Sequence, residues 1–217
     1  MKKSLNTVAS STYESLKHDI IFGILVPGMK LKLSPLKRQY SASVSTLRET
    51  LNRLASEGFV SAEEQRGFFV AAVSRDDLVE IANLRILLES HALKASIENG
   101  DAEWEGNIVA AHHKLKLAEE RMLSGDQSQK ETWKRYDWEF HQAMIQACNS
   151  RNLLSLHATI FDKYLRYQMQ VLTFRGQVAA GEHKKMLEAV LKRDTKGAQK
   201  ILEDHILGGL KHSMSAF

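Results

Sequence analysis

The chain has 217 residues, 43% hydrophobic and 26% charged, which is the balance of an ordinary soluble globular protein. Its length allows one large domain or two small ones, each able to bury a core. No apolar run approaches a membrane span, and the segment after Met1-Lys2-Lys3 lacks a secretory apolar core, so we expect a cytoplasmic protein. The single cysteine, Cys148, excludes an internal disulfide and a thiolate-rich zinc knuckle.

The positive charge is concentrated in the first third of the chain. Residues 1–74 hold 10 Lys+Arg against 6 Asp+Glu, whereas residues 75–217 hold 20 of each. Clustered positive charge is typical of a polyanion-binding domain, because neutralised phosphates release counterions. A solvated basic surface would give the same excess of positive charge. Charge alone therefore does not distinguish it from a polyanion-binding domain, and the sequence motifs are needed.

The proline distribution divides the chain at Ser74. Both prolines precede it, and the later glycines fall at predicted helix ends, at Gly100, Gly125, Gly176 and Gly181. Ser74 with Asp77 three residues later fits a helix start, in which a hydroxyl caps the helix and an acid answers it. We therefore predict a mixed domain over residues 1–74 and an all-helical domain over residues 75–217.

The first domain begins with a predicted amphipathic helix over residues 8–25, which residues 26–28 end. Residues 31–33 alternate apolar side chains with lysine, as a short extended piece does. Ser34 can cap a brief helix that starts at Pro35.

A second strongly patterned helix is predicted from Val44 to Glu57. Its leucines at positions 47, 51 and 54 form a buried face, and Gly58 ends it. Residues 59–60 and 68–70 flank a polar turn and predict a short hairpin. Helix, short helix, turn, helix and hairpin together make a winged helix-turn-helix.

This arrangement suits DNA, because the second helix of such a motif presents amides and hydroxyls to the major groove while a basic wing tip reaches the backbone or minor groove. Arg48 is the first candidate, since a guanidinium matches guanine or a phosphate. The residues expected to contact DNA are Arg38, Ser43, Ser45, Thr46, Arg48, Arg53, Arg66 and Gly67.

Residues 10–73 resemble the winged-helix domain of the GntR superfamily. The resemblance rests on Leu47-Arg48-Glu49, on Leu51 and Leu54, on Gly58-Phe59-Val60 and on Arg66-Gly67-Phe68-Phe69-Val70. Val44 and Ser34 stand where members of the family carry arginines, which implies a different operator; Arg38 is expected to compensate through a phosphate.

Residues 76–213 resemble the FCD effector domain of the FadR subfamily. The motifs are Arg85-x-x-Leu88-Glu89, Asp137-x-x-x-His141, Glu182-His183 and a later His205. The metal-binding branch of that subfamily uses one Asp and three His, which the resemblance places at Asp137, His141, His183 and His205.

The residues themselves support a metal site. Asp137 and His141 are four apart and so share one helix face, while His183 and His205 lie one per helix on the next two segments. Three imidazoles and a carboxylate suit zinc, our first expectation, or nickel, iron, cobalt or manganese. Against this, nine histidines are present, and those at 112, 113, 157 and 212 occupy predicted surface positions.

An open coordination position beside the ion would be the natural place for a carboxylate effector. Arg85 and Arg166 are the candidate anion clamp. The alternatives are that Arg85 pairs with Glu89 on its own helix and that Arg166 lies on the surface. Aromatic residues that could shape the cavity, or simply belong to the core, are Tyr136, Trp138, Tyr164, Tyr167 and Phe174.

The sequence thus predicts a homodimeric transcriptional repressor that binds a palindromic operator and is released by a small organic acid. Two alternatives remain. An Asp/His₃ site could activate water in a metal-dependent hydrolase, although Glu139 points away from the ligand face and leaves no evident general base. A metal-free architectural DNA binder is the other.

Overall fold

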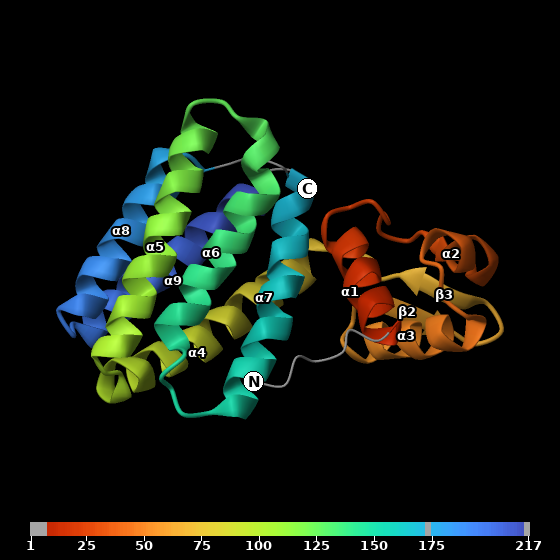
Figure 1. Cartoon of the computed structure of the whole chain (residues 1–217), viewed down its shortest axis with the longest axis horizontal. Helices are drawn as coiled ribbons and strands as arrows, with labels where there is room; N and C mark the ends of the chain where they lie inside the picture. The colour runs from red at the N-terminus through yellow and green to blue at the C-terminus, as the bar shows by residue number, and fades with distance from the viewer. Residues whose placement is uncertain (1–7, 172–174, 215–217) are drawn as a thin grey trace. The chain divides into compact units, whose positions relative to one another are not determined.

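The computed structural model describes residues 8–171 and 175–214, and it divides them into two compact units (Figure 1). The first unit comprises the described residues up to Asp77 together with Leu165–Val171. The second comprises Leu78–Tyr164 together with the described residues from Arg175 onward. Among the described residues, no helix is both long and apolar enough to cross a membrane.

The first unit is a winged helix-turn-helix. Its helices are α1 (Val8–Ile21), α2 (Leu33–Gln39) and α3 (Val44–Ser56), and its strands are β1 (Lys30–Leu31), β2 (Val60–Glu63) and β3 (Gly67–Val70). The strands form an antiparallel sheet in the order β1-β3-β2. The three leucines of α3 are fully buried against α1, as their spacing predicts.

Two local predictions for this unit were wrong in detail. The first helix ends at Ile21 rather than Leu25, and Gly23 then takes a positive φ of 76° that turns the chain. The short helix begins at Leu33 with Lys32 as its N-cap, so Ser34 lies inside the helix instead of capping it. The predicted start of α3 at Val44 holds, and the structure adds an N-cap there, since the Ser43 hydroxyl accepts the Thr46 amide at 3.1 Å.

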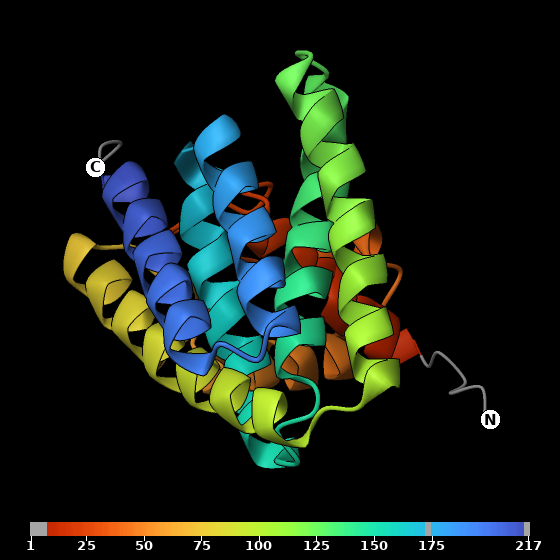
Figure 2. The ribbon, with the colours of Figure 1, turned by 90° about the vertical axis from the view of Figure 1, so that its left-hand side faces the viewer.

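The second unit is an all-helical bundle (Figure 2). Its helices are α4 (Arg75–Asn99, which starts in the first unit), α5 (Ala102–Leu123), α6 (Lys130–Ile145), α7 (Arg151–Val171, which ends in the first unit), α8 (Gln177–Leu191) and α9 (Thr195–Met214), with a 3₁₀ turn at Gln127–Gln129. α5 packs on α6 and α8, and α8 packs on α9. The indole of Trp104 fixes α5 to α6 by donating to the carbonyl of Ala143 at 2.9 Å.

The predicted helix boundaries of this unit hold with one exception. Gly100, Gly125 and Gly176 lie at helix ends, but Gly181 lies inside α8. At the start of α4, the Ser74 hydroxyl accepts the Asp77 amide at 3.1 Å. The Asp77 carboxylate accepts the Tyr167 hydroxyl instead of answering Ser74, so only half of the predicted capping box forms. The boundary after residue 74 stays a prediction.

Candidate functional site

The structure brings four potential metal ligands together inside the helical unit. Asp137 and His141 come from α6, His183 from α8 and His205 from α9, and one ligand atom of each lies within 4.8 Å of all the others. All four side chains are buried. Such a convergence from facing helices is how bundles build metal sites in their cores.

Helical spacing explains why these residues point inward. On α6 the buried positions include Trp133, Asp137, Phe140, His141 and Met144, which repeat every three or four residues. His183 lies on the buried face of α8, and His205 lies next to the fully buried Ile206 on α9. The polar ligands therefore occupy core positions on otherwise apolar helix faces.

The Nδ1 atom of each histidine in the cluster contacts a carboxylate. The Nδ1 of His183 lies 2.7 Å from Glu119, and the Nδ1 of His205 lies 2.7 Å from Glu182. His141 Nδ1 contacts Glu89 in the same way. A carboxylate on Nδ1 holds the proton there, which turns the lone pair of Nε2 toward the centre of the cluster and increases its basicity.

Two of the inward nitrogens have no well-formed hydrogen bond. The Nε2 atoms of His141 and His183 are buried without a hydrogen-bond partner. The Nε2 of His183 lies 3.2 Å from Oδ1 of Asp137, and that of His141 lies 3.8 Å from it. Because a buried polar atom without a partner is costly, a metal ion fits these donors better than an apolar core does.

Burial and the neighbouring carboxylates together set the charge of the three rings. It lowers the pKa of His205 to about 3 and also lowers the pKa of His141, so both are neutral near pH 7, as metal ligands must be. Burial acts on His183 too, but its contacts with Asp137 and Glu119 outweigh it and raise its pKa to about 9. Without an ion, His183 therefore carries a proton that a metal would displace.

Lys134 is a site residue that the sequence interpretation missed. Its side chain is buried on α6, and its Nζ lies 3.3 Å from Oδ2 of Asp137. Burial raises the pKa of Asp137, but the ammonium of Lys134 and the neighbouring histidines outweigh it and hold that pKa well below its usual range. The three-residue spacing on one helix was the only available signal.

Arg85 lies at the edge of the same cluster. It is 1% exposed, its Nε pairs with Glu89 at 2.9 Å, and its guanidinium stacks 4.2 Å from the centre of the Phe161 ring. The helix pair that the sequence offered as the alternative is therefore present. Contact between Arg85 and an effector stays a prediction.

Arg166 belongs to the first compact unit, with Leu165–Val171. It is buried and donates to the backbone carbonyl of Ala71, so it is not the surface residue that the alternative required. Its proposed role as an effector clamp also stays a prediction.

The structure corrects the placement of one histidine. His157, expected at the surface, is fully buried on α7, where its Nε2 lies 3.0 Å from Glu89 and its Nδ1 lies 2.8 Å from Gln142. Glu89 thus joins His157 to His141. Of the aromatic candidates, Tyr164 and Tyr167 are buried, Tyr136 and Trp138 are half-buried, and Phe174 lies outside the described residues.

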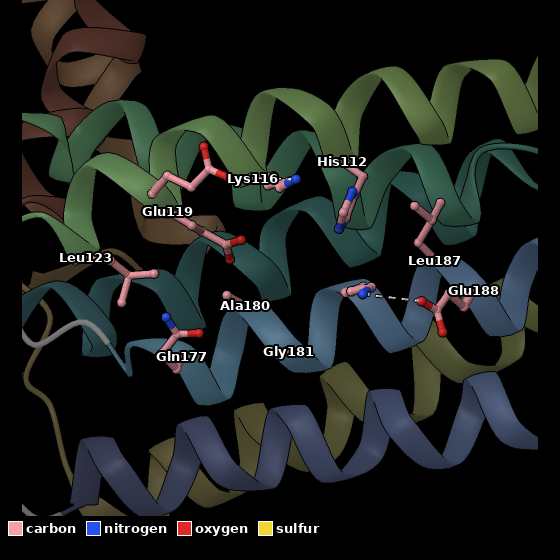
Figure 3. A pocket seen from close by; sticks show the side chains of 11 residues that line it. His112, Lys116, Glu119, Leu123, Gln177, Ala180, Gly181, Leu187 and Glu188 are labelled. Atoms are coloured by element: carbon pink, nitrogen blue, oxygen red, sulfur yellow. Dashed lines mark ion pairs between the residues drawn. The ribbon is translucent and has the colours of Figure 1, made fainter.

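A pocket of about 460 Å³ opens between α5 and α8 (Figure 3). Glu119 on α5 faces Ala180 on α8 at one end of it, and His112 on α5 lies near Leu187 on α8 at the other. His112 also lines the pocket, and burial lowers its pKa to about 4. Glu119 also contacts His183. The carboxylate that orients this candidate metal ligand therefore forms part of the pocket lining.

The DNA-reading candidates of α3 gather at its first turn. Ser43, Ser45 and Arg48 are exposed, and Thr46 is half-buried. The Ser43 hydroxyl lies 2.8 Å from that of Ser45 and 2.9 Å from that of Thr46. A solvated cluster of hydroxyls at a helix N-terminus, with an arginine one turn on, can donate to phosphates and base edges.

The remaining candidates lie on other elements. Arg38 on α2 is exposed, as are Arg66 and Gly67 at the hairpin turn. Arg66 pairs with Glu63 at 2.5 Å. Arg53, near the end of α3, pairs with Glu57 at 3.3 Å and stacks on a tyrosine ring, so it lies at the opposite end of α3 from the hydroxyl cluster.

Both units match described families. Residues 8–70 match the bacterial regulatory proteins of the gntR family, and residues 80–208 match the FCD domain. The second match covers more than half of the chain.

Several known proteins are similar along nearly the whole chain. The HTH-type transcriptional repressor GlaR of Escherichia coli (strain K12) is 33% identical over 205 residues, with 90% of each protein covered. BphR of Paraburkholderia xenovorans (strain LB400), an HTH-type transcriptional regulator, is 32% identical over 206 residues, covering 94% of this chain and 84% of BphR.

The fold is shared with solved structures. E. coli McbR/YncC matches with a TM-score of 0.81 at 22% identity, covering 97% of this chain and 98% of the other. A putative GntR regulator from Rhodococcus sp. RHA1 matches with a TM-score of 0.76 at 21% identity, covering 96% and 98%.

Proposed function

This chain belongs to the gntR family of bacterial regulatory proteins and carries an FCD domain, and we propose that it is a transcriptional repressor controlled by a small organic acid. It is a transcriptional regulator, as its relatives are. We assign operator binding to residues 1–74, and effector binding and dimerisation to residues 75–217. The two winged-helix units of one dimer together contact enough base pairs for a specific operator.

Operator recognition is assigned to the first turn of α3, with Arg48 as the principal side chain. The support is that Arg48 and the hydroxyls of Ser43 and Ser45 are exposed together. The wing tip at Arg66 and Gly67, with Arg38 and Arg53, completes the proposed contact set.

A divalent metal is assigned to Asp137, His141, His183 and His205. The observation that carries this assignment is that two buried Nε2 atoms lack hydrogen bonds while all three Nδ1 atoms contact carboxylates. Zinc fits the donor set, which nickel, iron, cobalt and manganese share. When bound, the ion would supply a Lewis-acidic position for a carboxylate oxygen.

The acid is proposed to bind near this centre, with Arg85 as its clamp, and to weaken operator binding; Arg166, the second clamp candidate, belongs to the other compact unit. A population shift suffices if the acid binds the operator-competent arrangement less tightly than the other one. The hydrolase alternative gains no support, because Glu139 is paired with Lys114 at 3.1 Å and with Arg135 at 3.8 Å instead of facing the cluster.

The test is fluorescence anisotropy on a labelled DNA fragment selected from a random pool by the wild-type protein. Mono- and dicarboxylates are titrated into the complex with and without chelator. We expect an acid to release the DNA from the metal-loaded protein and to release none of it after chelation. An acid that tightens DNA binding would contradict the repressor assignment, and equal release with and without metal would place the acid elsewhere.

A further inference from the structure

The outward face of α4 carries leucines where a solvated helix would carry polar side chains. Leu87 is 65% exposed and Leu84 is 44% exposed, and Leu88 beside them is half-buried. The inward face of the same helix already has partners, because the Glu89 carboxylate contacts His141 and His157. Single exposed leucines are common, but neighbours on one helix face mark an interaction surface.

Polar residues continue this face on both sides of the leucines. The exposed positions are Glu80, Leu84, Leu87, His91 and Lys94, which are spaced alternately by four and three residues. That spacing is the seam of a helix that pairs with another helix. Figure 2 shows α4 at the edge of the helical bundle.

The charges of this face are self-complementary. Glu80 precedes Leu87 by seven residues, and Lys94 follows it by seven. Seven residues rise about 10.5 Å along a helix, so two antiparallel copies related by a two-fold axis at Leu87 would place Glu80 of each beside Lys94 of the other. A parallel pairing would place like charges together.

We propose that the outward face of α4 is the surface on which a second copy of this chain docks, with two α4 helices antiparallel about Leu87. The leucines supply the apolar centre of the contact. The two Glu80–Lys94 pairs at its ends select the antiparallel direction. The inference rests on the dimer proposed above and names its surface.

Sedimentation equilibrium of the full-length, metal-loaded protein tests the apolar centre. Leu87→Asp is expected to raise the dimer dissociation constant at least about tenfold, because it places a charge in the middle of the contact. Leu117→Asp is the matched control, since Leu117 is 46% exposed on α5. Circular dichroism checks that both variants fold. Equal dissociation constants for the two variants, or a monomeric wild type, would overturn the proposal.

A charge exchange tests the direction. Glu80→Lys and Lys94→Glu are each expected to weaken the dimer, and the double variant is expected to recover to within a few-fold of wild type. Lys94 also lies 3.9 Å from Glu98 on its own helix, so Lys94→Glu adds a local repulsion that the double variant keeps. Recovery therefore isolates the contact between copies, and a double variant no better than the singles would contradict it.

These outcomes are separable from the proposed function. Release of operator by an acid is measured on the wild type and does not depend on which surface forms the dimer. Acid release together with an unaffected Leu87→Asp dimer would remove α4 and leave the repressor assignment standing. If the charge exchange gives the expected result but no acid releases the operator, the α4 surface stands and the acid-controlled repressor assignment falls.

Discussion

The two candidate sites of this protein differ in how they are held. The hydroxyls and Arg48 at the first turn of α3 are exposed and solvated, whereas the ligand cluster of α6, α8 and α9 is buried and each histidine rests on a carboxylate. Exposed groups can change without cost to the core. Buried, mutually dependent groups cannot, so we expect substitutions in the cluster to change folding stability and substitutions at the first turn of α3 to leave it unchanged.

The largest effect is expected from removing a cluster ligand. His141→Ala takes one donor from the metal and leaves the buried carboxylate of Glu89 without that partner, which we expect to cost about 3–5 kcal/mol. Elemental analysis and thermal unfolding measure metal content and stability together. His113→Ala, at an exposed position on α5, is the matched control. Unchanged metal content in His141→Ala would remove this residue from the site.

Next in size is the loss of the principal DNA contact. Arg48→Ala is expected to weaken operator binding by about 1–3 kcal/mol per half-site, because a guanidinium contact to base or phosphate is lost. Metal content and unfolding temperature are expected to stay at wild-type values, as for the exposed control Arg121→Ala. The comparison between the two sites would fail if Arg48→Ala destabilised the fold as His141→Ala does.

The buried site also predicts a pH dependence that the exposed site lacks. The pKa of His183 is raised from 6.5 to about 9 in the metal-free fold, so its proton stabilises that fold fully below pH 6.5, and this contribution is lost as pH rises through 9. The shift corresponds to about 3 kcal/mol at most. Denaturant unfolding of chelated protein measures it. His183→Gln is expected to flatten the profile and His113→Gln to leave it, and equal slopes in all three would contradict the assignment.

A smaller effect is expected from changing a carboxylate that contacts one of the metal ligands. Glu119→Gln removes the charge that holds the proton on Nδ1 of His183, and we expect metal affinity to fall about 10–100-fold with the fold intact. Competition with a chelator of known affinity measures this. Glu120→Gln, the exposed neighbour, is the control. Equal affinities in the two variants would mean that Glu119 does not orient the ligand.

Short-range pattern predicted much of this molecule. The leucine spacing of α3, its start at Val44 and the hairpin follow from residues within a turn or two of one another. The shared face of Asp137 and His141 follows in the same way. The end of α1 was overestimated, since apolar residues after Gly23 continue the helical pattern where the backbone already turns.

What the sequence could not show depends on packing between distant segments. Glu119 and His183 are 64 residues apart, and no periodicity relates them. His157 is 68 residues from Glu89, which is why it could be mistaken for a surface residue. Glu182 adjoins His183 in sequence yet contacts His205, a pairing that only the packing of α8 on α9 creates.

The most direct test of the central claim, that an acid binds at the buried metal centre, is a thermal-shift screen of the purified protein against mono- and dicarboxylates with and without chelator. The account predicts at least one acid that raises the unfolding temperature of the metal-loaded protein and has no effect after chelation. A stabilising acid whose shift is the same in metal-loaded and chelated protein would contradict it.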